Sequence, residues 1–268
     1  MTTGTSLATE NTKYVIGVQY DGGGLHGWQA QPGQQTVQGL LETAVGRVAD
    51  HSITLAVAGR TDAGVHATGQ VATFESSARR ECHEWLRGIN ALTPSTILVS
   101  WVRETHANFH PRYSATARRY LYVFYDAAPN PFVNGLAWAT QSLDADVMHR
   151  QAQDLLGEHD FTSFRAAGCQ SLTPRRRVDR CEVRRTGAYV VLDIEANAFL
   201  LHMVRNIARA LVDIGQRKVE ASIGSMLLAC DRNQIGATAP PQGLYLYQVR
   251  YPEESFPGPV MPPILTAT

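Results

Sequence analysis

Lysine is nearly absent from this chain of 268 residues: it stands only at Lys13 and Lys218, among 24 lysines and arginines. Arginine therefore supplies almost all of the positive charge, and its planar, permanently charged group suits bidentate contacts with phosphate. The 24 acidic residues balance the basic ones, so no net charge attracts the chain to nucleic acid or to membranes. Segment 160–185 nevertheless holds seven arginines against three acidic residues, which is compatible with a basic face on a neutral protein.

Long apolar runs and paired cysteines are also missing. No stretch reaches the roughly 18 apolar residues that a membrane span needs, and the polar N-terminus lacks the apolar core of a signal peptide. The four cysteines (Cys82, Cys169, Cys181, Cys230) form no C-x-x-C pair, which excludes zinc-ribbon spacing and argues against a disulfide framework. With 44% hydrophobic and 18% charged residues, we expect a packed cytoplasmic protein that does not bind membranes.

Apolar periodicity predicts two repeats of one element order, β-α-β-β-α-β. The first repeat has predicted strands at 14–20, 53–58, 69–75 and 97–104, with one helix capped by Thr36 and another at 81–92. The second has predicted strands at 118–126, 177–186, 189–196 and 243–251, with helices at 144–156, 200–215 and 220–230. These patterns predict an α+β fold of two ferredoxin-like units, each an antiparallel sheet with helices on one face.

The stretch THANFHPRYSA has no periodicity, so we place the junction between the units near 105–116. Active sites favour such seams, and we expect an active-site cleft between the two units. The predicted division is a flexible N-terminal tail 1–13, an N-terminal α+β domain 14–107, a C-terminal α+β domain 108–252 and a Pro-rich C-terminal tail 253–268.

The loop AGRTDAGVHA, residues 58–67, places Arg60, Asp62 and His66 among glycines directly after a predicted strand. Its glycine spacing is that of a P-loop, but the Lys-Ser/Thr that would reach phosphate does not follow. No other His/Asp pair has metal-like spacing, so we expect no metal and a structural, hydrogen-bonding His66. An aspartic protease would need a second Asp-Thr/Ser-Gly, which is absent from the sequence. An ordinary turn aspartate and a catalytic carboxylate remain as alternatives.

The string AGRTDAGVHATGQV resembles the signature of the TruA family of tRNA pseudouridine synthases. Further blocks resemble the family in its order: YDGGGLHGWQAQP, TVQGLLE, NFHPRYSATARRYLYVFY, LLGEHDFTSFRA, ANAFLLHMVRNI and GLYLYQV. The resemblance covers about 14 to 251. It implies isomerisation of uridine to pseudouridine at positions 38, 39 and 40 in the anticodon stem-loop of tRNA, without metal or cofactor. It also implies a homodimer whose subunits share the RNA-binding surface.

Site roles follow from the same resemblance. Asp62 matches the catalytic aspartate, Arg60 the arginine that helps extrude the base, and Tyr120 the tyrosine that packs on that base. Arg205 matches the basic partner of the aspartate, and Leu246 an apolar residue of the pocket. An ionised carboxylate serves either as nucleophile at C1′ or as base at C2′, and a paired guanidinium favours its charged form. An arginine plane in the vacated stack offsets the cost of flipping the base.

For the RNA-binding surface we expect six arginines from 112–119 and 175–185 to meet phosphates: Arg112, Arg118, Arg119, Arg175, Arg176 and Arg177. We also expect the loop glycines to let the backbone approach RNA. Arg209 stands where the family usually has glycine, one helical turn from Arg205, and makes either a phosphate contact or a surface salt bridge. A catalytically silent RNA-binding or folding factor is the alternative function. The joint presence of Asp62, Arg60, Tyr120 and Arg205 argues against it.

Overall fold

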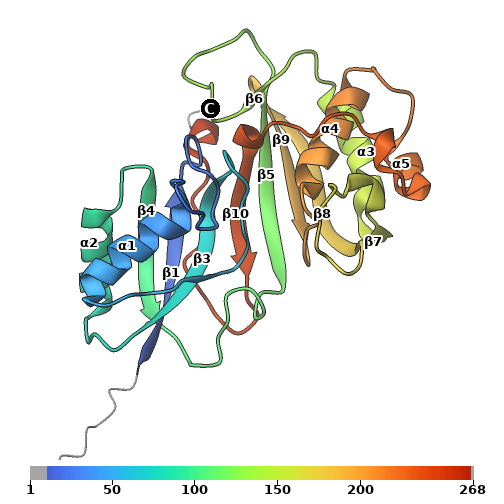
Figure 1. The fold of residues 1–268 in the computed structure, drawn as a ribbon. Helices are drawn as coiled ribbons and strands as arrows, with labels where there is room; N and C mark the ends of the chain where they lie inside the picture. The colour runs from blue at the N-terminus through green and yellow to red at the C-terminus, as the bar shows by residue number, and fades with distance from the viewer. Residues whose placement is uncertain (1–10, 267–268) are drawn as a thin grey trace, which may run out of the picture.

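The computed structural model describes residues 11–266, and its strands form one ten-stranded sheet in the order β4-β1-β3-β10-β5-β9-β8-β7, with β2 beside β3 and β6 beside β5 (Figure 1). The strands are β1 (Thr12–Tyr20), β2 (Ala56–Val57), β3 (His66–Ser76), β4 (Ile97–Glu104), β5 (Ala117–Tyr125), β6 (Trp138–Ala139), β7 (Gly157–Asp160), β8 (Arg175–Thr186), β9 (Tyr189–Ala196) and β10 (Leu244–Arg250). The helices are α1 (Val37–Ala49), α2 (Cys82–Leu92), α3 (Ala145–Ala152), α4 (Met203–Gly215) and α5 (Ile223–Ala229).

Both halves show the strand order expected of a β-α-β-β-α-β unit. The first half orders its strands β4-β1-β3 with β2 on the far edge of β3, and the second orders them β10-β5-β9-β8. The α+β fold class is therefore confirmed. The two units do not have separate sheets, however, because β10 pairs in parallel with β3 through Tyr245–His66 and Leu246–Ala67. One continuous sheet runs through both halves.

Several predicted boundaries differ from the structure. The strand expected at 53–58 shrinks to β2, because the backbone N–H of Leu55 donates to Oε1 of Glu42 at 2.9 Å instead of to β3. The helix expected at 144–156 ends at Ala152 and continues as a 3-10 turn, Gln153–Leu155. β1 begins at Thr12, inside the predicted tail 1–13, whose first ten residues lie outside the described part of the chain.

The helices of both halves cover the same face of the sheet. Leu244 and Leu246 share one face of β10, since side chains alternate along a strand. Leu244 packs in the core that contains residues of α3, α4 and α5, and Leu246 packs in the core with α1 and α2. The helices of the two halves therefore meet along a seam above β3, β10 and β5, and the candidate site lies in this seam (Figure 1).

The opposite face of the sheet is covered partly by the C-terminal segment. The ring of Phe256 stacks on that of Trp101 with centroids 5.0 Å apart, and Met261 packs against a cluster that includes Leu121 and Val191. Most of the predicted Pro-rich tail is thus packed on the sheet. Among residues 11–266, no helix combines the length and apolar character that crossing a bilayer requires.

Candidate active site

The loop that joins β2 to β3 brings Arg60 and Asp62 to the seam, and three neighbours hold its backbone. The hydroxyls of Tyr20 and Thr61 lie 2.8 Å apart. Nε2 of Gln70 donates to the carbonyl of Gly59 at 2.7 Å, and the backbone N–H of Trp28 donates to the carbonyl of Thr61 at 3.0 Å. Asp62 consequently sits on a loop fixed from both sides.

Two glycines make this packing possible. Gly27 has φ +77°, and a Cβ there would lie 2.6 Å from the carbonyl oxygen of Thr61, so only glycine fits beside the loop. Gly64 has φ +78° and faces Pro241, whose Cγ would lie 2.8 Å from an added Cβ. Our expectation that the loop glycines allow the approach of RNA is therefore corrected for Gly64, which allows the approach of another protein segment.

Asp62 meets two basic side chains from the start of α4, which follows it by about 140 residues in the sequence. Nη1 of Arg205 donates to Oδ2 of Asp62 at 3.2 Å, and Nε2 of His202 lies 3.2 Å from the same oxygen. Arg205 is also held by the carbonyl of Ala239, to which its Nε donates at 2.8 Å. The structure thus brings together the predicted pair of Asp62 and Arg205.

His202 is a site residue that the sequence pattern did not single out. It immediately precedes α4 with φ +59°, a left-handed conformation that is uncommon for residues other than glycine. Burial lowers its pKa, the nearby Asp62 opposes that shift, and the charges of Arg205 and Arg232 add to it. Its spacing from Arg205, three residues along a helix start, is the one signal that would have placed it on the same face.

Tyr120, the predicted base-packing tyrosine, lines the cavity beside Asp62. Burial raises the pKa of its phenol to about 12, so the hydroxyl keeps its proton at neutral pH. The edge of its ring meets Phe199 with centroids 5.1 Å apart. The apolar wall beside it is Leu244, whereas Leu246 is fully buried and belongs to the N-terminal core.

A cavity of about 400 Å³ surrounds these groups and draws its walls from both halves of the chain. This volume lies in the range of pockets for small ligands. Arg60 and Arg112 are exposed on it. Neither side chain makes a hydrogen bond or an ion pair with any residue from 11 to 266, and Arg112 lies over the ring of Tyr113. Two guanidinium groups are therefore free to meet an incoming anion.

Four of the other arginines expected to bind RNA have protein partners, and one of them is Arg177, whose Nε donates to Oδ1 of Asp179 at 2.8 Å. The guanidinium of Arg118 donates to four backbone carbonyls, among them that of Ala58 at 3.1 Å. Arg119 makes two hydrogen bonds to Asp193, at 2.7 and 2.6 Å. Arg176 is 8% exposed and donates to Ser171 and to the carbonyl of Thr173. Arg118, Arg119 and Arg176 stabilise the protein, and the contact of all four arginines with RNA stays a prediction.

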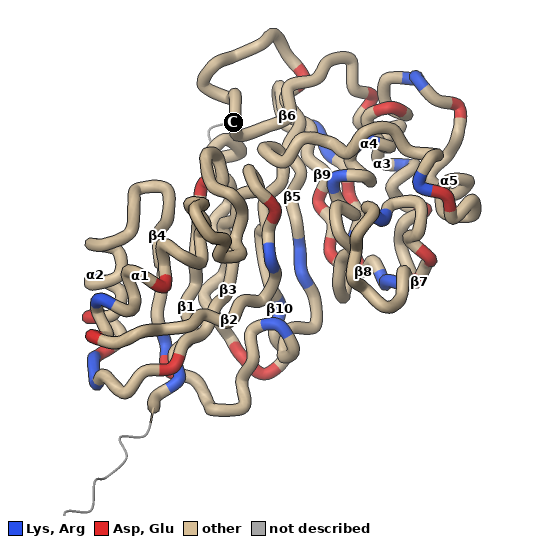
Figure 2. The backbone as a smooth tube through the Cα atoms, in the orientation of Figure 1, with Lys and Arg blue, Asp and Glu red and all other residues tan. Residues whose placement is uncertain are grey.

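Arg175 and Arg177 are exposed at the start of β8. Along the strand these two arginines alternate with Arg176 and Val178. Val178 packs in the core beneath the helices, so the side chains of Arg175 and Arg177 extend from the opposite face of the sheet. Figure 2 shows basic and acidic segments interspersed over the whole backbone.

Arg209, for which the sequence left a phosphate contact or a salt bridge open, forms a salt bridge with Asp213 at 2.8 Å.

His66 has the structural role that the sequence predicted. Its Nδ1 accepts from the backbone N–H of Gly22 at 3.1 Å, and its Nε2 lies 2.9 Å from the carbonyl oxygen of Gly135 and 3.1 Å from that of Gln242. The ring also stacks on Tyr245 at 4.7 Å. His66 therefore ties the loop that carries Asp62 to the C-terminal half. Within residues 11–266, no three His, Cys, Asp or Glu side chains are grouped so as to hold a metal.

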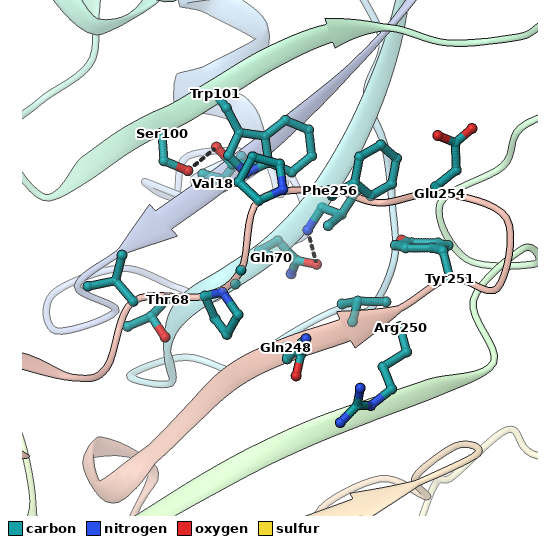
Figure 3. Close-up of a pocket in the computed structure, with 18 of the residues that line it drawn as sticks. Val18, Thr68, Gln70, Ser100, Trp101, Gln248, Arg250, Tyr251, Glu254 and Phe256 are labelled. Atoms are coloured by element: carbon teal, nitrogen blue, oxygen red, sulfur yellow. Dashed lines mark hydrogen bonds between the residues drawn. The ribbon is translucent and has the colours of Figure 1, made fainter.

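A second cavity, of about 550 Å³, lies on the opposite face of the sheet under residues 251–260. Figure 3 shows its wall, with Trp101, Phe256 and Arg250 from three different segments. Its charged side chains are engaged elsewhere: Arg250 with Glu195 at 2.8 Å, and Glu254 with His106 at 3.5 Å. In the seam cavity, by contrast, Asp62 contacts two basic side chains, and Arg60 and Arg112 line the wall without a polar partner among the described residues. The seam cavity is therefore the better candidate for an active site.

Comparison with known proteins identifies the family of the chain. A family model described as "tRNA pseudouridine synthase" matches residues 16–114 and 151–252. Proteins named "tRNA pseudouridine synthase A" from Shewanella sp. (strain W3-18-1) and Shewanella baltica (strain OS185) are each 51% identical over 245 residues, which cover 90% of this chain and 94% of theirs. A solved structure titled "Crystal Structure of a Cbf5-Nop10-Gar1 Complex" matches 87% of this chain and 57% of its own at 8% identity, but its TM-score of 0.34 is too low to carry an argument.

Proposed function

Because this chain belongs to the tRNA pseudouridine synthase family, we propose that it isomerises uridine to pseudouridine at positions 38, 39 and 40 in the anticodon stem-loop of tRNA. The observation that carries this proposal is the contact of Asp62 with Arg205 in a cavity built from both halves of the chain. A carboxylate that pairs with a guanidinium and is open to a ligand in the cavity is the arrangement that the reaction requires.

The reaction needs no external oxidant, reductant or group donor. The bond between C1′ and N1 breaks, the uracil turns, and a bond forms between C1′ and C5. C5 then loses its proton, and N1 ends with one. Asp62 acts as nucleophile at C1′ or as base at C2′, and both roles require the ionised carboxylate that Arg205 favours.

The other cavity residues have complementary roles in this proposal. A uridine stacked in RNA hides its ribose, so it must leave the stack at a cost of a few kcal/mol. Arg60 is exposed, lies two residues from Asp62 and lacks a polar partner among the described residues, which suits it to fill the vacated position. Tyr120 offers its ring to the flipped base, and its protonated hydroxyl can relay a proton, taking the one that C5 loses while it passes its own on to the side of N1.

Partner and location follow from the same proposal. The partner is the tRNA anticodon stem-loop, and Arg112 on the cavity wall is the arginine best placed to meet a phosphate near the flipped base. The family resemblance supports a homodimer whose subunits share the RNA, and we place the protein in the cytoplasm with its substrate. The proposed chemistry uses side chains alone, without metal or cofactor.

The test is direct. Purified protein is incubated with an unmodified tRNA transcript that carries uridines at positions 38 to 40, and pseudouridine is mapped by chemical labelling and primer extension. We expect pseudouridine at those positions and nowhere else in the transcript. Binding of tRNA without any pseudouridine would instead favour the silent RNA-binding factor.

A further inference from the structure

The side chain of His202 makes a contact that its place in the fold does not require. It stands at the position preceding α4, where polar side chains commonly cap the free N–H groups of a helix. It makes no such capping bond. Its Nε2 instead lies 3.2 Å from Oδ2 of Asp62, and its backbone adopts the left-handed φ of +59°. Uncommon backbone conformations cluster at functional sites, because the surrounding structure must hold them.

The two oxygens of Asp62 have different surroundings. Oδ2 is contacted by Nη1 of Arg205 and by Nε2 of His202, both at 3.2 Å. Within residues 11–266, the hydrogen bond to the side chain of Asp62 goes to Oδ2 and none goes to Oδ1. The side chain is 34% exposed and lines the cavity, so the carboxylate is open to a ligand there.

We propose that His202 is a positioning residue for the catalytic aspartate: with Arg205 it holds Oδ2 of Asp62 and leaves Oδ1 to react with the ribose. The inference rests on the proposed function of the site. A contact from a second side chain fixes the plane of a carboxylate better than one donor alone, since a single donor leaves the group free to turn about the bond between its β and γ carbons. His202 itself does not touch the reacting atoms.

The protonation state of His202 decides what it contributes. The charged groups around it are Asp62 from the catalytic loop, Arg205 from α4 and Arg232 from the segment after α5. Burial, with the two arginines, lowers its pKa below the ordinary value, against the effect of Asp62. At neutral pH the ring is therefore uncharged, and its Nε2 packs 3.2 Å from Oδ2 without the alignment of a hydrogen bond. When the pH falls through the lowered pKa, the ring takes up a proton and adds a second full positive charge beside Oδ2, which draws the carboxylate away from reaction.

Three substitutions separate this role from a purely structural one. Glutamine places its amide nitrogen near the position of the imidazole Nε2 and cannot titrate. Alanine removes the contact. Asparagine tolerates the left-handed backbone but ends too short to reach Oδ2. Pseudouridine formation is measured for wild type, His202→Gln, His202→Ala and His202→Asn under single turnover from pH 5 to 9, with tRNA affinity and thermal unfolding measured alongside.

We expect His202→Ala and His202→Asn to lower the single-turnover rate at pH 7.5 by about tenfold or more, with tRNA affinity within about twofold of wild type. His202→Gln restores most of that rate, and at the acid end of the pH range it loses less of its activity than wild type does. An alanine variant with the rate and pH profile of wild type overturns the proposal. So does a glutamine variant no faster than a folded asparagine variant, which keeps the comparison decisive even if alanine unfolds the protein. If wild type itself makes no pseudouridine, the proposed function fails first.

Discussion

At the scale of single residues, the site depends on pairing groups that lie far apart in the sequence. Asp62 comes from a loop in the first half, and Arg205 and His202 come from the start of one helix in the second. Tyr120 reaches the same cavity from β5. Each of these side chains has an ordinary structural use when taken alone. Their convergence on one carboxylate oxygen and one cavity is what indicates catalysis.

Replacement of Arg205 by methionine should slow the reaction mainly by leaving Asp62 without its charged partner. Arg205 is 13% exposed, and removing one member of a largely buried pair costs about 3–5 kcal/mol. Since Asp62 is partly solvated, we expect the low end of that range for the unfolding free energy. For kcat we expect a loss of about a hundredfold, the usual effect of removing one group that acts on the charge of a reacting centre. Arg209→Met is the matched control, because Arg209 lies one turn further along α4 and pairs with Asp213 instead. Equal losses in the two variants would contradict a specific role for Arg205.

Tyr120→Phe keeps the ring but removes the hydroxyl. We expect tRNA affinity to stay within about twofold and kcat to fall by about tenfold or more, the usual effect of losing a positioned acid or base. The pKa of Tyr120 is raised to about 12, so the phenol keeps its proton well above neutral pH. Tyr120 should therefore cause no loss of wild-type activity between pH 7 and pH 10. A decline in that interval that disappears in Tyr120→Phe would show that the phenol titrates much lower than the structure indicates.

At the scale of elements, two loops and one helix start make the site rigid. The loop after β2 is held by the Gly-rich loop before α1, and α4 is anchored through Asn206, which is fully buried. Nδ2 of Asn206 donates to the carbonyl of Phe164 at 2.8 Å, and its Oδ1 accepts from Thr238 at 2.8 Å. This anchor lies beside Ala239, whose carbonyl holds Arg205. Precise placement of a catalytic group depends on such supporting contacts.

Two glycines of the Gly-rich loop test this support. Gly27 and Gly24 have nearly equal φ angles, +77° and +78°, but an added Cβ at Gly27 would lie 2.6 Å from the backbone of Thr61, whereas at Gly24 it would meet nothing within 4 Å. Gly24→Ala should cost only the strain of a left-handed alanine, about 1–2 kcal/mol of unfolding free energy. Gly27→Ala should cost more and also lower kcat, because it displaces the loop of Asp62. Urea unfolding and single-turnover rates measure both quantities. A Gly27→Ala variant as active as Gly24→Ala would show that the contact does not position Asp62.

The sequence predicted elements and local motifs well and long-range partners poorly. The hairpin of β8 and β9 and the cap at Thr36 depend on local pattern, and the structure has them as predicted. Arg118, Arg119 and Arg176 show where prediction from the sequence fails. Their sequence suggests a basic surface, but Asp193, the partner of Arg119, lies 74 residues away and becomes its neighbour only when β5 and β9 pair. His202 was missed for the same reason, since its partner is 140 positions earlier.

At the scale of the whole molecule, one continuous sheet explains how two similar units make a single site. The parallel pairing of β10 with β3 joins the halves, and His66 spans the same seam. This junction places the catalytic loop of one half against the start of α4 in the other.

Several arginine side chains of the sheet are paired with carboxylates. Asp193 forms ion pairs with Arg119, Arg180 and Arg184. Burial alone would raise the pKa of Asp193, but its contacts with Arg119 and Arg180 outweigh burial and lower it. The positive charge of these arginines is thus balanced by a carboxylate of the same chain.

Binding of tRNA should therefore depend on the arginines that remain exposed, of which Arg112 and Arg175 have no ion-pair partner within residues 11–266 and Arg177 pairs with Asp179 at the surface. Arg112→Glu should weaken tRNA binding and reduce the slope of log affinity against log salt by roughly 0.7 to 0.9, the value for one phosphate contact. The double variant Arg175→Glu, Arg177→Glu should do the same if the RNA extends to β8. Arg79→Glu is the control, because Arg79 is exposed and follows the end of β3 that lies away from His66. Equal slopes for wild type and the double variant would remove β8 from the RNA path and leave the catalytic assignment intact.

The measurement that tests the central claim most directly is pseudouridine formation by Asp62→Asn under single turnover, with tRNA binding measured on the same preparation. Asparagine keeps the shape of aspartate and loses the charge that either mechanism requires. We predict that wild type converts the uridines at positions 38 to 40. We predict that Asp62→Asn forms no detectable pseudouridine while it binds the same tRNA within a few-fold of wild type. A folded Asp62→Asn protein that converts these uridines at a rate near that of wild type would contradict the account.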